Sequence, residues 1–420
     1  MEVQITTFGA LLGLAVAIIL IIKKVQPAYS LILGAVVGGL VGGAGLTSTV
    51  DIMIGGAKDI MPAILRIVTS GVLAGVLIQT GAAAKIADQI INALGEKRAL
   101  FALSLSTMIL TSVGVFVDVA VITVAPIAIA VGRKLRYSPI VLLLAMTGGG
   151  KCGNVISPNP NTISGAENFG VELSSLMMAN IIPAIFGLIV TVIITSILAK
   201  KLKHEVTEYE AEAEVNNDLP AFLPAIIGPI VAIALLALRP LIGVTVDPLI
   251  ALPVGGIIGV IAMGKAKNLN DYVVFGLSKM MPVAILLIGT GTVAGIIKSS
   301  GLQATTISLL SSMNMPEFLL APISGILMSA ATASTTAGTT IASATFAPAI
   351  LAVGISPLAG GAMVHAGATV LDHLPHGSFF HATAGSVNMS ISDRLKLIPY
   401  ESMIGLTITI VSTLMWGVIL

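Results

Sequence analysis

Two polar segments, one in each half of the chain, carry residue types that suit the binding of a small anion. The first is GGGKCGNVISPNPNT at 148–162, where glycines, prolines and amides interrupt an otherwise apolar stretch. A helix cannot continue through Pro158 and Pro160 with its hydrogen bonds intact, so backbone groups become available to an ion or a substrate. Lys151 lies inside this span, and its ammonium group would suit a carboxylate. The alternative is a structural pair with an acid such as Asp118.

The second polar segment is VHAGATVLDHLPHGS at 364–378. An ungapped offset of 218 residues, counted from Ser138-Pro139 to Ser356-Pro357, places Lys151 opposite Thr369 and Asn154 opposite Asp372. Four of the five histidines lie between 365 and 381. Their spacing matches no strong metal pattern, so we expect hydrogen bonding to a substrate or proton handling, and no metal or other cofactor.

A third cluster, ATASTTAGTT at 331–340, is dense in hydroxyl groups. Serine and threonine at this density can cap helix ends, and they can equally bind a hydroxylated substrate. The two roles are compatible. The three segments together give the candidates for substrate binding: Lys151, Asn154, Ser157, Asn159, Asn161, Ser334, Thr335, Thr336, Thr369 and His376.

The candidates for a coupling proton are Asp118, Asp372 and His365. Asp118 is the one charged residue between Ala99 and Gly132. A carboxylate moved from water into such surroundings favours its neutral form, which a proton carrier needs. The alternative is that Asp118 pairs with Lys151 and that Asp372 caps a helix end.

The composition decides the class of protein that positions these residues. Hydrophobic residues make up 56% of the chain and charged residues 10%, whereas a soluble protein carries about 25% charged residues. Uncharged runs such as 25–50 and 173–199 reach the ~20 residues that cross a bilayer. The sequence therefore predicts an all-α, multi-pass protein of the inner membrane, with the lipid bilayer as a partner. A net charge of +1 argues against nucleic acid, and a single cysteine excludes an intrachain disulfide framework.

The two halves of the chain resemble each other. Met61-Pro62 matches Met281-Pro282, Ala74-Gly75 matches Ala294-Gly295, and further pairs follow in the same order. Internal repeats of this kind are typical of secondary transporters. We divide the chain into an N-terminal repeat at 1–199, a charged linker at 200–218 and a C-terminal repeat at 219–420.

Two pairs of apolar segments are too short to cross a bilayer, for which about 17 residues are needed. They are 99–113 with 119–132, and 318–330 with 340–353. We predict that each pair is a re-entrant hairpin; the alternative is a pair of thin, tilted spans. Five spans then remain in each half, and because five is odd the second repeat is inverted. The predicted spans are 5–22, 28–46, 60–80, 138–163, 173–198, 221–238, 247–264, 280–297, 357–385 and 398–419.

The basic residues orient this arrangement. With the N-terminus outside, most of them fall on the cytoplasmic side, in agreement with the positive-inside rule. This places the linker at 200–218 in the cytoplasm, opens the first hairpin from the cytoplasm and opens the second from outside. The residues predicted inside are Lys23, Lys24, Lys97, Arg98, Arg133, Lys134, Arg136, Lys200, Lys201, Lys203, Lys265, Lys267, Arg394 and Lys396.

Three motifs give the sequence a family resemblance over essentially its whole length. They are GGGKCGNVISPNPN at 148–161, MANIIPAIFG at 178–187 and MVHAGATVLDHLPHGSFFHATAG at 363–385. With them the chain resembles the gluconate:proton symporter (GntP-type gluconate permease) family of the ion-transporter superfamily. The resemblance implies scaffold and transport domains, two hairpins, two broken helices, a homodimer and an elevator-like motion. It also implies proton-coupled transport of gluconate and related sugar acids, glycerate or D-serine.

Residues and resemblance together predict a secondary active transporter and no enzyme. The expected activity is proton-coupled uptake of a small hydroxy-carboxylate or sugar acid, such as gluconate or glycerate. One alternative is a sodium-coupled symporter of organic anions, because unwound carbonyls and side-chain oxygens can also hold sodium. Another alternative is an ion channel, although two repeats with broken helices favour alternating access.

Overall fold

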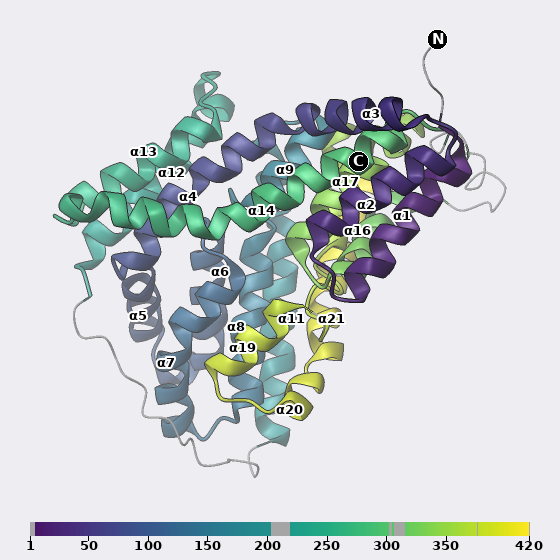
Figure 1. Cartoon of the computed structure of the whole chain (residues 1–420). Helices are drawn as coiled ribbons and strands as arrows, with labels where there is room; N and C mark the ends of the chain where they lie inside the picture. The colour runs from purple at the N-terminus through teal and green to yellow at the C-terminus, as the bar shows by residue number, and fades with distance from the viewer. Residues whose placement is uncertain (1–4, 203–218, 302–304, 306–315, 376, 420) are drawn as a thin grey trace.

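A computed structural model describes residues 5–202, 219–301, 305, 316–375 and 377–419. All regular elements in these ranges are helices (Figure 1). The first half contains α1 (Thr7–Ile22), α2 (Pro27–Val41), α3 (Leu46–Asp59), α4 (Met61–Gln79), α5 (Ala82–Leu94), η1 (Glu96–Arg98), α6 (Ala99–Ser112), α7 (Val117–Leu135), α8 (Pro139–Asn154), α9 (Pro160–Phe169), α10 (Leu173–Ala179) and α11 (Ile181–Lys201).

The second half contains α12 (Phe222–Ile242), α13 (Pro248–Ala262), η2 (Ala266–Asn268), α14 (Leu269–Lys298), η3 (Glu317–Leu319), α16 (Leu320–Thr332), α17 (Thr335–Ala352), α18 (Pro357–Gly367), α19 (Ser378–Ser386), α20 (Ile391–Leu395), α21 (Ile398–Thr413) and η4 (Leu414–Ile419). Helix α11 ends at Lys201. The rest of the predicted linker, from residue 203 to 218, lies outside the described residues.

Several helices have the length and the surface that a bilayer requires. Among the described residues, four helical stretches are long and apolar enough to cross: 61–79, 181–201, 266–298 and 391–419. On α11, large apolar side chains stay about half exposed, including Ile185 at 46%, Ile189 at 49% and Ile193 at 51%. They recur every four residues and so form one stripe along the helix. A stripe of this kind suits contact with lipid.

Helices α4 and α14 cross at glycines, and the crossing uses equivalent positions in both halves. A Cβ atom on Gly75 would lie 2.1 Å from the carbonyl oxygen of Tyr272, and a Cβ on Gly295 would lie 2.5 Å from that of Ile52. Gly295 lies 220 residues after Gly75, and Tyr272 lies 220 residues after Ile52. The contact between the end of α4 and the start of α14 therefore recurs between α3 and the end of α14. Small residues allow these backbones to approach closely.

The apolar core is divided between two clusters, each of which mixes the halves of the chain. In one, α13 packs on α4 and α12 packs on α5, and the cluster continues through α6 to α8 and α11, with residues such as Leu73, Leu142 and Leu252. In the other, α1 and α2 pack with the end of α14 and with α16 to α18, around Leu31, Ile296 and Met363. The first two helices of each half therefore pack against helices of the opposite half.

The structure corrects several predicted boundaries. Helices α3 and α5 occupy stretches for which no element was predicted, because residues such as Asp51, Lys85 and Asp88 hide them from a search for apolar spans. Helix α14 begins at Leu269 and not near 280, since charged Asp271 and Lys279 lie inside it.

The second arm of each predicted hairpin is longer than expected. Helix α7 has 19 residues and α17 has 18. The hydroxyl-rich stretch at 331–340 separates the two predicted arms of the second hairpin, yet most of it lies in α16 and α17. The chain turns only at Ala333 and Ser334, because the Ser334 hydroxyl caps α17 and the following threonines continue the helix.

Candidate functional site

Asparagine side chains satisfy the backbone at the break in the first broken helix. Helix α8 ends at Asn154 and α9 begins at Pro160, as the prolines predict. The Asn159 Oδ1 atom accepts hydrogen bonds from the backbone nitrogens of Asn161, at 3.0 Å, and Thr162, at 3.1 Å. Its Nδ2 atom donates to the carbonyl oxygen of Asn154, at 2.9 Å, and to that residue's Oδ1, at 2.6 Å. The side chain thus caps α9 and ties it to the end of α8.

The second broken helix brings a carboxylate into the interior. Helix α18 ends at Gly367 and α19 begins at Ser378. Between them the Thr369 hydroxyl donates to the carbonyl oxygen of Ala366, at 2.7 Å. Asp372 and His373 follow, and both are buried.

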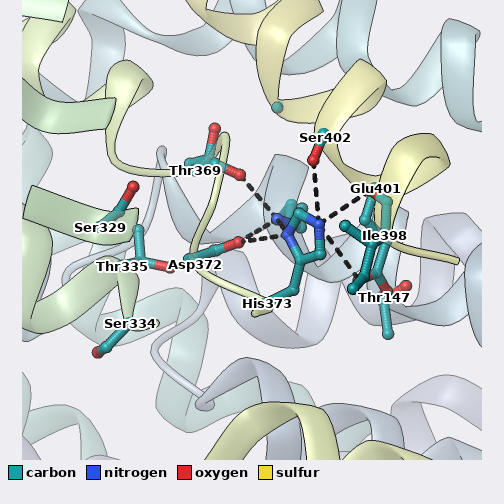
Figure 2. A network of polar contacts seen from close by, with 12 residues as sticks. Thr147, Ser329, Ser334, Thr335, Thr369, Asp372, His373, Ile398, Glu401 and Ser402 are labelled. Carbon is teal, nitrogen blue, oxygen red and sulfur yellow. Dashed lines mark hydrogen bonds and ion pairs between the residues drawn. The ribbon is translucent and has the colours of Figure 1, made fainter. Parts of the chain in front are cut away.

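Lys151 joins the two breaks. Its side chain is 1% exposed, and its ammonium forms an ion pair with Oδ1 of Asp372, whose side chain is 6% exposed. The same ammonium donates to the carbonyl oxygen of Thr369, at 2.7 Å, and lies 3.0 Å from Nδ1 of His373 (Figure 2). The alternative in which Lys151 pairs with Asp118 is wrong, because Asp372 is the acid that reaches it. Lys151 and Thr369, matched by the repeat offset, lie in direct contact.

The turn between α16 and α17 contacts both broken helices. Ala333 adopts a left-handed conformation with φ 47°, and Ser334 caps α17 by accepting from the backbone nitrogen of Ala337, at 3.2 Å. The Thr335 hydroxyl donates to Oδ2 of Asp372, at 2.5 Å. The Thr336 hydroxyl donates to Oδ1 of Asn161, also at 2.5 Å. The turn therefore brings its threonine hydroxyls into contact with a polar side chain of each broken helix.

The remaining candidates lie apart from this network. Ser157 lies in the first break, fully buried, and its hydroxyl has no hydrogen-bond partner within the described part of the chain. Asp118 is half-buried in the first turn of α7, where it accepts from the backbone nitrogen of Val119. His365 is fully buried on α18, and neither ring nitrogen has a partner among the described residues. His376 lies outside the described residues.

Sequence reasoning missed a second group of buried polar residues beside Asp372. Arg394 and Glu401 are both 0% exposed and form an ion pair, with Nη2 3.0 Å from Oε2. Arg394 was assigned to a cytoplasmic loop because of its charge; its burial shows that it does not lie in solvent. Glu401 lies within the predicted span 398–419, and no role was predicted for it.

The geometry describes a buried pair of opposite charges with polar groups on several sides. Breaking a buried ion pair costs about 3–5 kcal/mol when one partner is left uncompensated. Lys151 therefore needs an anion at all times, either Asp372 or a replacement for it. An arrangement of this kind can exchange one carboxylate for another.

Comparison with known proteins places the chain among permeases. It is 60% identical over 99% of both chains to an uncharacterized transporter of Haemophilus influenzae. It is 21% identical to the high-affinity gluconate transporter of Escherichia coli, over 95% of this chain and 96% of that one. It is also 21% identical to the Gnt-II system L-idonate transporter of Escherichia coli, over 91% of this chain and 92% of that one.

A solved structure shares the fold. The YdaH transporter of Alcanivorax borkumensis superimposes with a TM-score of 0.69, at 17% sequence identity, over 89% of this chain and 90% of that one. An inner membrane permease of Escherichia coli is 29% identical over 41% of this chain and 38% of its own length. The protein is a multi-pass permease of the inner membrane and not an enzyme. The sequence profile of GntP family permeases matches residues 5–419, and the chain belongs to that family.

Proposed function

We propose that the protein is a proton-coupled symporter that takes up a small hydroxy-carboxylate or sugar acid such as gluconate or glycerate. The proposal of a sugar acid is supported by the gluconate and L-idonate transporters among its relatives. The observation that carries the proposal of proton coupling is the buried pair of Lys151 and Asp372 at the meeting point of two broken helices.

Coupling follows from competition for Lys151. In the substrate-free state Asp372 neutralises the ammonium. When Asp372 takes up one proton, it no longer needs the ammonium, and the carboxylate of the substrate takes its place. Both states then carry no net charge at the site: Lys151 with ionised Asp372, or Lys151 with the substrate anion and protonated Asp372. Because an uncompensated charge at membrane depth is costly, only these two states move across the bilayer.

The neighbouring polar groups suit the rest of a hydroxylated acid. Thr335 hydrogen-bonds Asp372 directly, and Thr336 and Asn161 hydrogen-bond each other. Hydroxyl and amide groups can both donate and accept, so they match the hydroxyl groups of a sugar acid. Asn154, Ser157, Asn159, Ser334 and Thr369 line the same breaks and turn. Of the proton candidates, Asp372 is the one in contact with Lys151; Asp118 and His365 are not.

We also propose that the chain is built from two inverted repeats, each with one re-entrant hairpin, formed by α6 with α7 and by α16 with α17. The equivalent glycine contacts of α4 and α14 support this arrangement. In an elevator-like motion, the broken helices and hairpins would carry the site across the membrane as one transport domain. Arg66 on α4 forms an ion pair with Glu167 on α9, so this contact would break and re-form. A homodimer, expected from the family, completes the proposal.

Uptake into liposomes tests the proposed function. Purified protein is reconstituted without sodium, and an acidic outside is imposed while valinomycin and equal potassium concentrations hold the membrane potential at zero. We expect labelled gluconate or glycerate to accumulate against its gradient. Because the site exchanges one proton and one anion together, an imposed potential at equal pH should drive no uptake of a monoanion. Accumulation that requires sodium, or that collapses to passive equilibration, would contradict proton symport.

A further inference from the structure

A second buried ion pair lies next to the proposed binding site and takes no part in it. Arg394 and Glu401 are both completely buried, with Nη2 and Oε2 3.0 Å apart. The Arg394 guanidinium also lies over the rings of Phe380, at 5.0 Å, and Phe379, at 5.9 Å. Burying two charges costs about as much as their attraction returns, so the pair is weak as a purely stabilising device. Its position relative to Asp372 suggests another role.

His373 connects this pair to the binding site. On one side its Nδ1 atom lies 3.0 Å from the Lys151 ammonium and 3.1 Å from Oδ1 of Asp372. On the other side its Nε2 atom lies 3.0 Å from the carbonyl oxygen of Ile398 and 3.2 Å from the hydroxyl of Ser402. The Glu401 carboxylate lies 3.9 Å from the same nitrogen, and Figure 2 shows the ring between the two acids.

The contacts define where the ring proton lies. A backbone carbonyl only accepts hydrogen bonds, so the Nε2 atom carries the proton that points to Ile398. The Lys151 ammonium only donates, so Nδ1 is the accepting nitrogen. In this tautomer the Nδ1 lone pair accepts from Lys151 beside Asp372, and the Nε2 proton lies on the Glu401 side. When the ammonium turns to the substrate carboxylate, the lone pair becomes available to the proton of Asp372. It is therefore set to take a proton from Asp372 and to release one toward Glu401.

We propose that His373 and Glu401 form the internal route by which the coupling proton leaves Asp372; this rests on the proton symport proposed above. Protonated Asp372 gives its proton to Nδ1 of His373, which becomes a cation with a proton on each nitrogen. Nε2 then gives its own proton to the Glu401 carboxylate, whose Oε2 atom lies 3.9 Å away. One proton has moved, Asp372 is again ionised and ready to pair with Lys151, and Glu401 is neutral. Loss of that proton to water and a return of the ring tautomer reset the route.

The position of the route agrees with release on the cytoplasmic side. Arg394 belongs to α20, which lies at the lower end of the molecule in Figure 1. The last turn of α11, with Lys200 and Lys201, reaches the same end. The basic residues predict that this end faces the cytoplasm. Two guanidinium nitrogens of Arg394, Nε and Nη1, are buried without a partner in the described part of the chain, and such groups are ordinarily satisfied by water. Hydrated groups there would continue the route outward from Glu401.

Glu401→Gln tests the route because it keeps the shape of the side chain and removes its acid–base function. The matched control is Arg394→Gln/Glu401→Gln, which removes both charges and leaves neither uncompensated. His373→Gln interrupts the connection at its centre. Three measurements are made on liposomes or purified protein: net uptake driven by an acidic outside, exchange of labelled for unlabelled gluconate at equal pH, and melting temperature.

Exchange needs no proton release, because the loaded carrier returns with its proton. We expect Glu401→Gln to lower net uptake about 100-fold, the scale of a lost proton-transfer group, and to leave exchange at the wild-type rate. His373→Gln should lower net uptake as well, but exchange is compared for Glu401→Gln alone, because His373 itself contacts Lys151 and Asp372. The double variant should recover the melting temperature lost by Glu401→Gln without recovering net uptake. Recovery of net uptake in the double variant would overturn the route and make the pair structural. Equal losses of exchange and net uptake would also overturn it. If wild-type protein itself shows no uptake driven by a pH gradient, the proposed symport fails first.

Discussion

Lys151 and Asp372 form a buried ion pair although they stand 221 residues apart in the sequence. Lys151 lies in the last turn of α8, just before the first break, and Asp372 lies in the second break, in the other half of the chain. The pair makes the site depend on both halves at once. The lysine is thus already neutralised without a substrate, and in the proposed mechanism binding replaces one carboxylate by another.

The first prediction concerns this pair. Lys151→Ala should abolish uptake and also destabilise the protein by about 3–5 kcal/mol, because Asp372 is left buried without its cation. The double variant Lys151→Met/Asp372→Asn removes both charges and should recover most of the stability but none of the uptake. Thermal unfolding in detergent and liposome uptake measure the two effects. Normal transport by Lys151→Ala would show that the substrate carboxylate binds elsewhere.

The second prediction concerns the turn between α16 and α17. Thr335→Val removes the hydroxyl that donates to Asp372 while preserving the branched shape. A hydrogen bond to a charged group contributes about 1.5–3 kcal/mol, so uptake at low substrate concentration should fall about tenfold or more. Thr335→Ser keeps the hydroxyl and should stay close to wild type. Equal activity of the valine and serine variants would remove this hydroxyl from the site.

The third prediction uses two adjacent glycines of α3 that differ in their surroundings. A Cβ on Gly56 would lie 2.2 Å from the carbonyl oxygen of Gly291, whereas a Cβ on Gly55 would meet nothing within 4 Å. Gly56→Ala should therefore force α3 and α14 apart and cost about 1–3 kcal/mol. Gly55→Ala should cost nothing and gain up to about 1 kcal/mol of helix propensity. Thermal unfolding of the two variants gives the comparison, and a stable Gly56→Ala would contradict the close crossing.

The fourth prediction concerns orientation in the membrane. The sole cysteine, Cys152, is buried and should give little background labelling. A cysteine at Lys298, whose side chain is 72% exposed, should react with an impermeant maleimide added to spheroplasts. A cysteine at Glu96, 53% exposed, should react only after the membrane is permeabilised. The reverse pattern would invert the whole arrangement, including the side on which the proton is released.

The sequence is informative where a residue type constrains the backbone directly. Pro158 and Pro160 predict the first broken helix, and the structure has it there. That prediction rests on local chemistry, because proline constrains the backbone wherever it stands. The contact between Lys151 and Thr369 is a separate finding, since a repeat offset pairs positions in the sequence and does not predict that they touch.

The partners of buried charges could not be predicted in the same way. The sequence alone does not choose between Asp118 and Asp372 as the partner of Lys151, since each is the single acid of a long stretch in its half. Which of them reaches Lys151 depends on the crossing of α8 with the second break. Arg394 and Glu401 were missed for a related reason, because a charge at the edge of an apolar run has the same signature whether it faces water or another charge.

The separation of Lys151 from Asp372 has a consequence for biosynthesis. The ribosome completes the first half long before the residue that neutralises its lysine exists. At about 5–20 residues per second, the 221 intervening residues take about 10 to 45 seconds to synthesise. During that interval Lys151 and the glycine faces of α3 and α4 have no permanent partners, because these are supplied by α14 and by the second break. The pair of Lys151 and Asp372 therefore cannot form until the second half of the chain has been made.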